Sequence, residues 1–365
     1  MTIETARVQP GDHAPWFKAP ALSGSQSYAF DTVAGRHVLM LFFGSIRDPR
    51  AAEALAAVQR HRSLFDDDQA CFFGVTIDPE DSAQGRIRQE LPGIRHFLDY
   101  QGKLSRLYGA ADEKAYRPRW FLLDPRLRVL DIFAVDQGEE AIGALRQAIA
   151  DKSKDAWAPV LEIPAVFEPE LCRELIGLYE ADGGEESGFM RDVDGKTVHM
   201  IDHFHKQRRD FTIDDPELKK RIGARVTRRI NPALLRSFQF HSTRMERYIV
   251  ACYEPGAGHF RPHRDNTTLG TAHRKFAVTI NLNAGDYEGG DLRFPEFGAR
   301  TYRAPTGGAI VFSCGLLHEA TPVTQGKRYA FLPFLYDEEG ARIREKNDPF
   351  LAEGGGQYRM DSKGG

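Results

Sequence analysis

The sequence is poor in cysteine. Its 365 residues include only Cys71, Cys172, Cys252 and Cys314, and no two of them form a Cys-x-x-Cys pair. That absence excludes the usual dithiol redox motif and the commonest closely spaced zinc ligands. Each cysteine lies within an apolar pattern, so we expect buried, reduced thiols in a cytoplasmic protein.

Long hydrophobic runs and a strong charge imbalance are also missing. The longest apolar runs, such as Val38 to Phe43, have the length of a strand and cannot span a bilayer. The first ten residues contain no apolar core of a signal peptide, so we expect none. A net charge of −3 predicts no bulk attraction to nucleic acid or to a membrane.

What the chain does contain is enough apolar material for two ordinary domains. Of its residues, 41% are hydrophobic and 28% are charged, and a length of 365 residues favours two domains. We predict an α/β domain over residues 1–150, a polar linker over 151–157, a second domain over 158–342 and a flexible tail over 343–365.

The first half alternates strand and helix signals, which predicts an α/β sandwich. Asp48 and Pro49 form a helix start, with an N-cap followed by proline at the first helical position. The expected strands are 37–44, 70–78, 95–98, 120–124 and 129–133, and the expected helices start at 48 and cover 79–89, 104–109 and 139–150.

The second half begins with helical patterns and turns to β-structure after Arg244. Helices are expected from Pro169, from Pro216 and after Asn231, and the Gly-rich turns between the later short strands favour a double-sheet jelly roll. The expected strands are 247–253, 258–262, 275–283, 291–294, 308–314, 317–323 and 327–336.

The stretch from Tyr253 to Asp265 holds the strongest chemical signal. It ends in His263-x-Asp265, and His263 is the only one of the 12 histidines with an aspartate two positions later. Ligands one residue apart on a strand point to the same face, where an imidazole and a carboxylate can bind one ion. With a second histidine, such a set holds Fe(II) and leaves coordination positions open.

Two histidines downstream can complete this set. His273 lies in a polar loop soon after the motif, and His318 follows the apolar strand that ends at Cys314. Arg328 comes ten residues after His318 and opens another apolar strand. Its guanidinium could hold a carboxylate through two hydrogen bonds, as a dicarboxylic cosubstrate would require.

From about Pro159 to Asp337 the sequence resembles the prolyl-4-hydroxylase-like branch of the Fe(II)/2-oxoglutarate-dependent dioxygenases. The matching pieces are Tyr253, Pro-His-Arg-Asp at 262–265, Glu-Gly-Gly-Asp-Leu-Arg-Phe at 288–294, His-Glu-Ala-Thr-Pro-Val at 318–323, and Gly-Lys-Arg at 326–328. The resemblance implies a double-stranded β-helix, Fe(II), 2-oxoglutarate as cosubstrate and O2. Ascorbate is a candidate additional cofactor.

The same resemblance assigns roles to residues. His263, Asp265 and His318 would bind iron, and Arg328 would pair with the distal carboxylate of 2-oxoglutarate, with Tyr253 donating a hydrogen bond to it. Thr279 and Asn281 alternate so as to face inward and are candidates to line the cosubstrate pocket. Related halogenases lack the carboxylate, so Asp265 favours hydroxylation, with release of succinate and CO2.

The first half resembles the thioredoxin-like fold of the peroxiredoxin and redoxin family. The matching motifs are 11–17, Phe-Phe-Gly at 42–44, Val-Thr-Ile-Asp at 75–78 and 118–124, and the resemblance implies a cis peptide bond at Pro118. The family's peroxidatic cysteine is absent from the segment after Gly44, which reads Ser-Ile-Arg-Asp-Pro-Arg-Ala-Ala-Glu. We therefore expect a redox-inactive domain used for docking or for pairing into a homodimer, and the alternative is a residual thiol role for Cys71.

Two further regions leave alternatives open. Residues 206–236 have ten basic and four acidic side chains, which fits either a solvated outer face or a surface for an acidic partner. His199, His203 and His205 are a remote candidate for a second metal site, and the region including Arg208 and Arg209 is a candidate for substrate contact.

Three functional hypotheses follow. The leading one is a 2-oxoglutarate-dependent hydroxylase that acts on a peptidyl residue, a free amino acid or a small metabolite, with a slight preference for a peptidyl substrate. The second is a non-enzymatic metal-binding or sensor protein with a vestigial site. The third is a bifunctional protein that retains thiol peroxidase activity. The sequence leaves open whether the C-terminal tail covers the active site.

Overall fold

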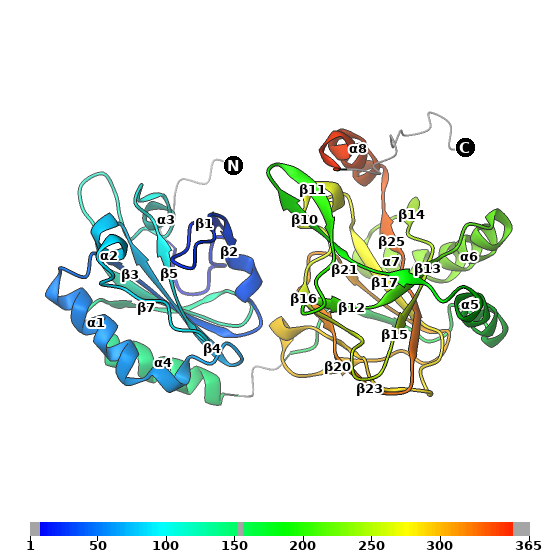
Figure 1. Cartoon of the computed structure of the whole chain (residues 1–365), viewed down its shortest axis with the longest axis horizontal. Helices are drawn as coiled ribbons and strands as arrows, with labels where there is room; N and C mark the ends of the chain where they lie inside the picture. Colours follow the sequence, from blue (N-terminus) through cyan, green and yellow to red (C-terminus); the bar gives the residue numbers. More distant parts are fainter. Residues whose placement is uncertain (1–7, 152–155, 353–365) are drawn as a thin grey trace. The chain divides into compact units, whose positions relative to one another are not determined.

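The computed structural model describes residues 8–151 and 156–352 of the chain (Figure 1). The chain divides into two compact units. The first contains the residues up to 156 together with 295–298, and the second contains 157–294 and the residues from 299 onward. Residues 152–155 of the predicted linker and 353–365 of the predicted tail lie outside the described residues.

The first unit is built on one five-stranded sheet (Figure 1). The strands pair in parallel from β5 to β3 and antiparallel from β3 to β7. In spatial order they are β5 (Ile94–Leu98), β4 (Ala70–Thr76), β3 (His37–Gly44), β6 (Arg119–Leu123) and β7 (Val129–Ala134). A small ribbon of β1 (Lys18–Ala19) and β2 (Tyr28–Ala29) precedes them.

Helices cover this sheet because its central strands are apolar on both faces. On one face, α1 (Pro49–Arg60) and α4 (Gly138–Ala150) pack against Leu39, Leu41 and Trp120. Asp48 caps α1 by accepting a hydrogen bond from the Arg50 N–H at 2.9 Å. Shorter helical segments are α2 (Pro79–Ala83), α3 (Lys103–Leu107), η1 (Phe30–Val33) and η2 (Arg62–Leu64).

Two expectations for this unit are wrong. The helix expected over 79–89 ends at Ala83, and Gly85 soon after it has a positive φ of 63°, which leaves the helical conformation. The peptide bond before Pro118 is trans, and the cis bond among the described residues is Leu91–Pro92.

The second unit contains two antiparallel sheets whose inner faces meet at Tyr253, Phe260 and Ala320. The larger sheet has the order β14 (Arg244–Glu246), β25 (Phe334–Tyr336), β17 (Phe276–Asn281), β24 (Arg328–Phe331), β15 (Ile249–Tyr253), β13 (Arg209–Thr212) and β9 (Glu185–Glu186). In addition, β21 (Ala309–Ser313) pairs with β17, and β8 (Leu161–Ile163) pairs with β21.

The smaller sheet has the order β12 (Lys206–Gln207), β16 (His259–His263), β22 (His318–Ala320), β19 (Leu292–Arg293) and β20 (Thr301–Tyr302). Two ribbons complete the unit, β10 (Phe189–Val193) with β11 (Lys196–Met200) and β18 (Glu288–Gly289) with β23 (Val323–Gln325). Its short 3₁₀ helices are η4 (Leu269–Thr271) and η6 (Asp348–Phe350), whereas η5 (Pro295–Phe297) belongs to the first unit. The predicted organisation, an α/β domain followed by a double-sheet β domain with flanking helices, is confirmed.

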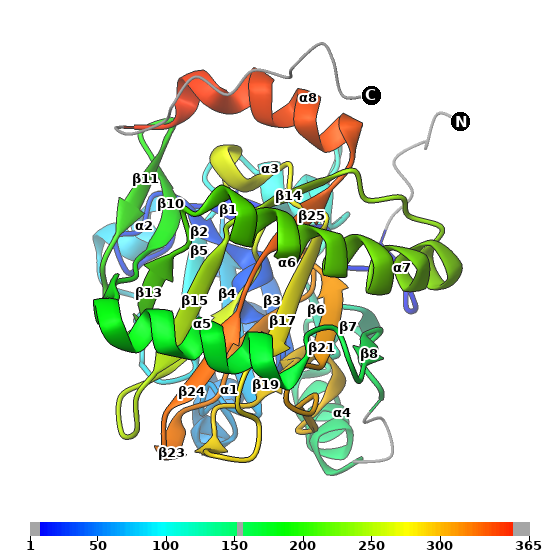
Figure 2. The same cartoon turned by 90° about the vertical axis from the view of Figure 1, so that its right-hand side faces the viewer.

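Helices α5 (Pro169–Asp182), α6 (Pro216–Arg229) and α7 (Asn231–Phe238) pack on the outer face of the larger sheet (Figure 2). The basic residues of α6 pair with acids of the neighbouring helix. Arg221 lies 2.7 Å from Glu174, and Glu168 accepts from both Arg225 and Arg229 at 2.6 Å. Three of the ten basic residues therefore join α6 to α5 and to its N-cap residue, Glu168.

Helix α8 (Glu338–Asn347) was not expected, because the sequence after Arg244 was interpreted as β-structure throughout. It is mostly polar and begins at Asp337, whose side chain accepts from the Gly340 N–H at 2.8 Å. The predicted flexible tail thus begins inside a helix. Within the described residues, no helix is both long and apolar enough to cross a membrane.

Candidate metal and dicarboxylate site

Two neighbouring strands bring the candidate metal ligands together. His263 ends β16 and His318 begins β22, and the two residues are direct partners in this antiparallel pair. The chain then places Asp265 two residues after His263, where its N–H donates to the Cys314 carbonyl at 3.0 Å. Residues 55 positions apart in sequence thereby meet at one end of the smaller sheet.

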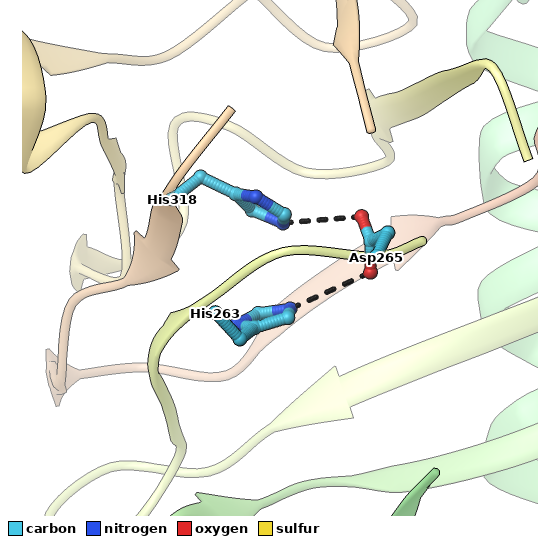
Figure 3. Close-up of side chains that lie close together, drawn as sticks. All are labelled: His263, Asp265 and His318. Atoms are coloured by element: carbon cyan, nitrogen blue, oxygen red, sulfur yellow. Dashed lines mark ion pairs between the residues drawn. The ribbon is translucent and has the colours of Figure 1, made fainter. Parts of the chain in front are cut away.

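The three side chains form one compact cluster (Figure 3). Asp265 Oδ1 lies 3.6 Å from His263 Nε2, and Asp265 Oδ2 lies 3.3 Å from His318 Nε2. Their candidate ligand atoms all fall within 4.8 Å of one another, and this is the only such group found among the described residues. His273 is not part of it, because its Nε2 lies 3.1 Å from Glu246.

Backbone carbonyls fix the orientation of both imidazoles. His263 Nδ1 donates to the Arg261 carbonyl at 2.8 Å, and His318 Nδ1 donates to the Leu316 carbonyl at 3.0 Å. Both Nε2 atoms are then left with a lone pair directed toward Asp265. The Phe260 ring stacks on His263 with 3.4 Å between ring centroids, so the imidazole has little rotational freedom. Such outer hydrogen bonds are typical of metal-binding histidines.

Burial and charge favour the protonation states that bind metal. Burial, followed by the charge of His318, lowers the pKa of His263 to about 4. Burial alone would raise the pKa of Asp265, but the charge of His318 and the close approach of both imidazoles outweigh it and hold that pKa well below its usual range. A neutral imidazole and an ionised carboxylate are the ligand forms that a divalent metal requires. The residues present therefore fit Fe(II).

Arg328 presents an unsatisfied guanidinium on the inner face of the larger sheet. The residue is 2% exposed, and its Nε and Nη1 atoms have no hydrogen-bond partner among the described residues. Gly290 leaves room for the side chain, since a Cβ at that position would lie 3.1 Å from Arg328 Cδ. A buried cation without an acceptor is costly unless an anion joins it. The space around the Arg328 guanidinium and its two available nitrogens therefore fit a carboxylate.

Tyr253 lies directly opposite Arg328 in the register of β15 and β24. The Arg328 Cζ atom is 4.9 Å from the centre of the Tyr253 ring, and Tyr253 is 3% exposed. Its hydroxyl accepts a hydrogen bond from Arg208 Nη1 at 3.2 Å. The structure therefore brings together the two residues that were assigned to the distal carboxylate.

Thr279 and Asn281 lie on β17 and are both buried. They alternate with Val278 and Ile280, which pack into the core under the outer helices, so they face the interior between the sheets. Asn281 donates to the Ala304 carbonyl at 2.7 Å. In the described residues, neither side chain is hydrogen-bonded to the histidine–aspartate cluster or to Arg328. Their contact with a cosubstrate stays a prediction.

The three histidines that were candidates for a second metal site form no such cluster among the described residues. His199 accepts from the Gly188 N–H at 3.1 Å, His203 lies 3.1 Å from Glu186, and His205 packs 4.5 Å from the Phe189 ring. The chain from 201 to 207 runs beside β16, and His205 lies 6.4 Å from the His263 ring. This region therefore lies next to the candidate metal ligands.

Sequence analysis missed the buried ion pair of Arg208 with Asp210. Arg208 donates to Asp210 Oδ1 at 2.6 Å and to Oδ2 at 2.7 Å, while Arg209 points to the opposite side and binds the carbonyls of Gly183 and Gly184. The pattern Arg-x-Asp at strand spacing was the available signal, since such side chains share a face.

The first unit has no reactive thiol in its described residues. Cys71 is fully buried, and burial raises the pKa of its thiol to about 12. In the segment after β3, Ser45 donates to Asp78 at 2.7 Å, and the Ile46 N–H donates to Asp81 at 3.1 Å. Asp81 also accepts from Thr76 at 2.7 Å. These hydrogen bonds lie in the segment where members of the redoxin family carry the peroxidatic thiol.

Comparisons with known proteins agree with this division. Residues 248–336 match the family model of the 2OG-Fe(II) oxygenase superfamily, and residues 10–132 match that of the AhpC/TSA family. A PKHD-type hydroxylase of Synechococcus sp. (strain JA-2-3B'a(2-13)) is 31% identical over 93 residues, which are 24% of this chain and 41% of the relative. The chain thus spans about two fifths of that relative's length.

A PKHD-type hydroxylase of Shewanella sp. (strain MR-7) is 27% identical over 201 residues, which are 50% of this chain and 82% of the relative. Among solved structures, a prolyl-4-hydroxylase of Pseudomonas putida is similar over 49% of this chain and 94% of its own, at 19% identity and a TM-score of 0.38. The chain joins an N-terminal AhpC/TSA redoxin domain to a C-terminal domain of the 2OG-Fe(II) oxygenase superfamily, similar to the PKHD-type hydroxylases.

Proposed function

We propose that the chain is an Fe(II)- and 2-oxoglutarate-dependent oxygenase that hydroxylates a C–H bond and releases succinate and CO2. The observation that carries this proposal is the pairing of two open sites in one domain. Two Nε2 atoms and a carboxylate converge at one site, and at the other the buried Nε and Nη1 atoms of Arg328 have no acceptor among the described residues. A keto acid with a distal carboxylate can satisfy both.

Each residue has a distinct task in this proposal. His263, Asp265 and His318 would hold the metal on one side and leave its other positions open. Arg328 would bind the distal carboxylate of the cosubstrate, assisted by Tyr253. When bound, iron and 2-oxoglutarate supply the oxidising power with O2. The Asp265 carboxylate would fill the place that a halide takes in related halogenases, which favours hydroxylation.

The proposed substrate is a peptidyl residue, with a free amino acid or a small metabolite as the alternatives. The support is architectural, since a redoxin domain without a reactive thiol could serve to recruit a protein or to pair two copies of the chain. The named relatives are PKHD-type hydroxylases, which agrees with hydroxylation but does not identify the substrate.

The test is 2-oxoglutarate consumption with stoichiometric succinate, measured with Fe(II) and O2 across peptide and amino-acid pools. We expect the parent to consume 2-oxoglutarate, and to do so faster when the pool contains the substrate. His318→Ala should consume none. Arg221→Ala on the outer helix α6 is the matched control and should turn over like the parent. Equal succinate release by the parent and His318→Ala would reject the proposal.

A further inference from the structure

Arg208 is a buried arginine whose donors are directed at three groups. The residue is 7% exposed. Besides its two hydrogen bonds to Asp210, Nη2 donates to Ser187 Oγ at 3.2 Å and Nη1 donates to the Tyr253 hydroxyl at 3.2 Å. Its planar guanidinium is therefore fixed by acceptors on several sides.

Asp210 holds this arginine firmly. Burial alone would raise the pKa of Asp210, but the charges of Arg208 and Arg247 outweigh it and hold the pKa at about 2. Arg247 also donates to Asp210 at 3.1 Å, and Lys206 reaches the same network by donating to Ser187 Oγ at 2.7 Å. A buried carboxylate with this many donors fixes the position of each group that it contacts.

The Tyr253 ring lies between two guanidinium groups. Its centre is 5.7 Å from Arg208 Cζ and 4.9 Å from Arg328 Cζ. An arginine has donors only, so the Tyr253 oxygen must accept from Arg208. The hydroxyl hydrogen must then point to some other acceptor, and no described residue other than Arg208 is hydrogen-bonded to this hydroxyl.

The geometry points to Arg208 as a positioning residue for the cosubstrate. We propose that Arg208, fixed by Asp210, holds the Tyr253 oxygen as an acceptor and so directs the phenol hydrogen to the carboxylate bound by Arg328. This inference rests on the proposed function. It gives the pair of Arg208, directly before β13, and Asp210, within β13, a role in the affinity for dicarboxylic keto acids, although Arg208 itself need not touch the cosubstrate.

A double-mutant cycle tests this role. Anaerobic protein with Fe(II) is titrated with 2-oxoglutarate, and the visible charge-transfer band of the chelated keto acid reports the dissociation constant. We expect Tyr253→Phe to raise this constant roughly tenfold, because one hydrogen bond to a charged group is lost. Arg208→Gln should raise it several-fold alone and not further in the Tyr253→Phe background.

Three controls separate positioning from folding or simple charge. Titration with 2-oxobutyrate, a keto acid without the distal carboxylate, should give the same constant in every variant. Arg208→Lys, which keeps the charge but loses the paired hydrogen bonds to Asp210, should weaken 2-oxoglutarate binding as Arg208→Gln does. Arg209→Gln, whose guanidinium binds backbone carbonyls outside the site, should bind like the parent.

The outcomes are distinguishable. No band in the parent would reject the proposed function itself. A band in the parent, with Arg208→Gln weakening 2-oxoglutarate equally in both Tyr253 backgrounds, would show that Arg208 acts independently of the phenol. Loss of affinity for 2-oxobutyrate as well would make the Arg208–Asp210 pair a general structural element, and either result would overturn this inference.

Discussion

The metal and dicarboxylate site and the segment after β3 of the first unit treat their polar groups in opposite ways. At that site, Arg328 has two nitrogens without a hydrogen-bond partner among the described residues, and the two histidines bind backbone carbonyls through Nδ1 and not through Nε2. In the segment after β3 of the first unit, Ser45 and Asp81 satisfy each other and the neighbouring backbone. Open polar groups therefore mark the candidate ligand site, and satisfied ones mark the segment where redoxin-family members carry a thiol.

The segment after β3 holds structural hydrogen bonds in place of a thiol. The segment that would carry a peroxidatic cysteine now forms the N-cap of α1 and hydrogen bonds to Asp78 and Asp81. The remaining cysteine of this unit, Cys71, lies in the middle of the sheet, where its thiolate is disfavoured. Resemblance of fold alone would not have separated the active from the inactive unit.

The largest effect should come from Arg328. Arg328→Ala should raise the dissociation constant for 2-oxoglutarate by about 100-fold, because a paired, charge-assisted contact is lost. Fe(II) affinity should stay within about twofold of the parent value, since the metal ligands lie on the other sheet. Equilibrium titration of both ligands measures this, and an unchanged constant for 2-oxoglutarate would remove Arg328 from the site.

The next effect is on the free energy of unfolding of the first unit. Asp81→Ala should destabilise the first unit by on the order of 3 kcal/mol, because Thr76 and the Ile46 N–H lose a buried acceptor. Glu140→Ala, at an exposed position of α4, is the control. Urea unfolding followed by tryptophan fluorescence measures both. Dissociation constants for Fe(II) and 2-oxoglutarate should not change, and a coupled loss would contradict the separation of roles.

A third prediction uses pH. Burial lowers the pKa of His96 in β5 to about 4, whereas the unfolded chain protonates near 6.5. As the pH falls from about 6.5 to 4, the unfolded state takes up a proton that the folded state does not, so stability falls by up to roughly 3 kcal/mol. The free energy of unfolding, measured between pH 6.5 and 4, should fall less in His96→Gln than in His13→Gln, a variant at an exposed position. Equal pH dependence of the free energy of unfolding in both variants would contradict a lowered pKa of His96.

The smallest effect should come from Cys71. Cys71→Ala should leave peroxide consumption at the background rate of the parent, because a buried thiol with a raised pKa supplies no thiolate. A peroxide assay with a thiol reductant measures this. Consumption by the parent that disappears in Cys71→Ala would instead show that the first unit retains redox chemistry.

Much of the candidate site could be predicted from sequence because strand geometry is regular. The spacing in His263-x-Asp265 predicted two ligands on one face, and the family resemblance selected His318 over His273 as the third, in agreement with the cluster that forms. Arg208 was expected only as part of a substrate-contact region, and its pairing with Asp210 was missed because β13 is a short strand within a basic region, where the alternation is hard to recognise. Helix α8 was missed because, among its described side chains, it buries only Gly340 and Ala341, which leaves no apolar stripe to recognise.

The most direct test of the central claim is an anaerobic titration of the full chain with Fe(II) and then 2-oxoglutarate. The account predicts a visible charge-transfer band in the parent, no band in His263→Ala, and a band that needs far more cosubstrate in Arg328→Ala. Absence of a band in the parent, with Fe(II) binding unchanged in His263→Ala, would contradict the account and would make the cluster of His263, Asp265 and His318 a relic.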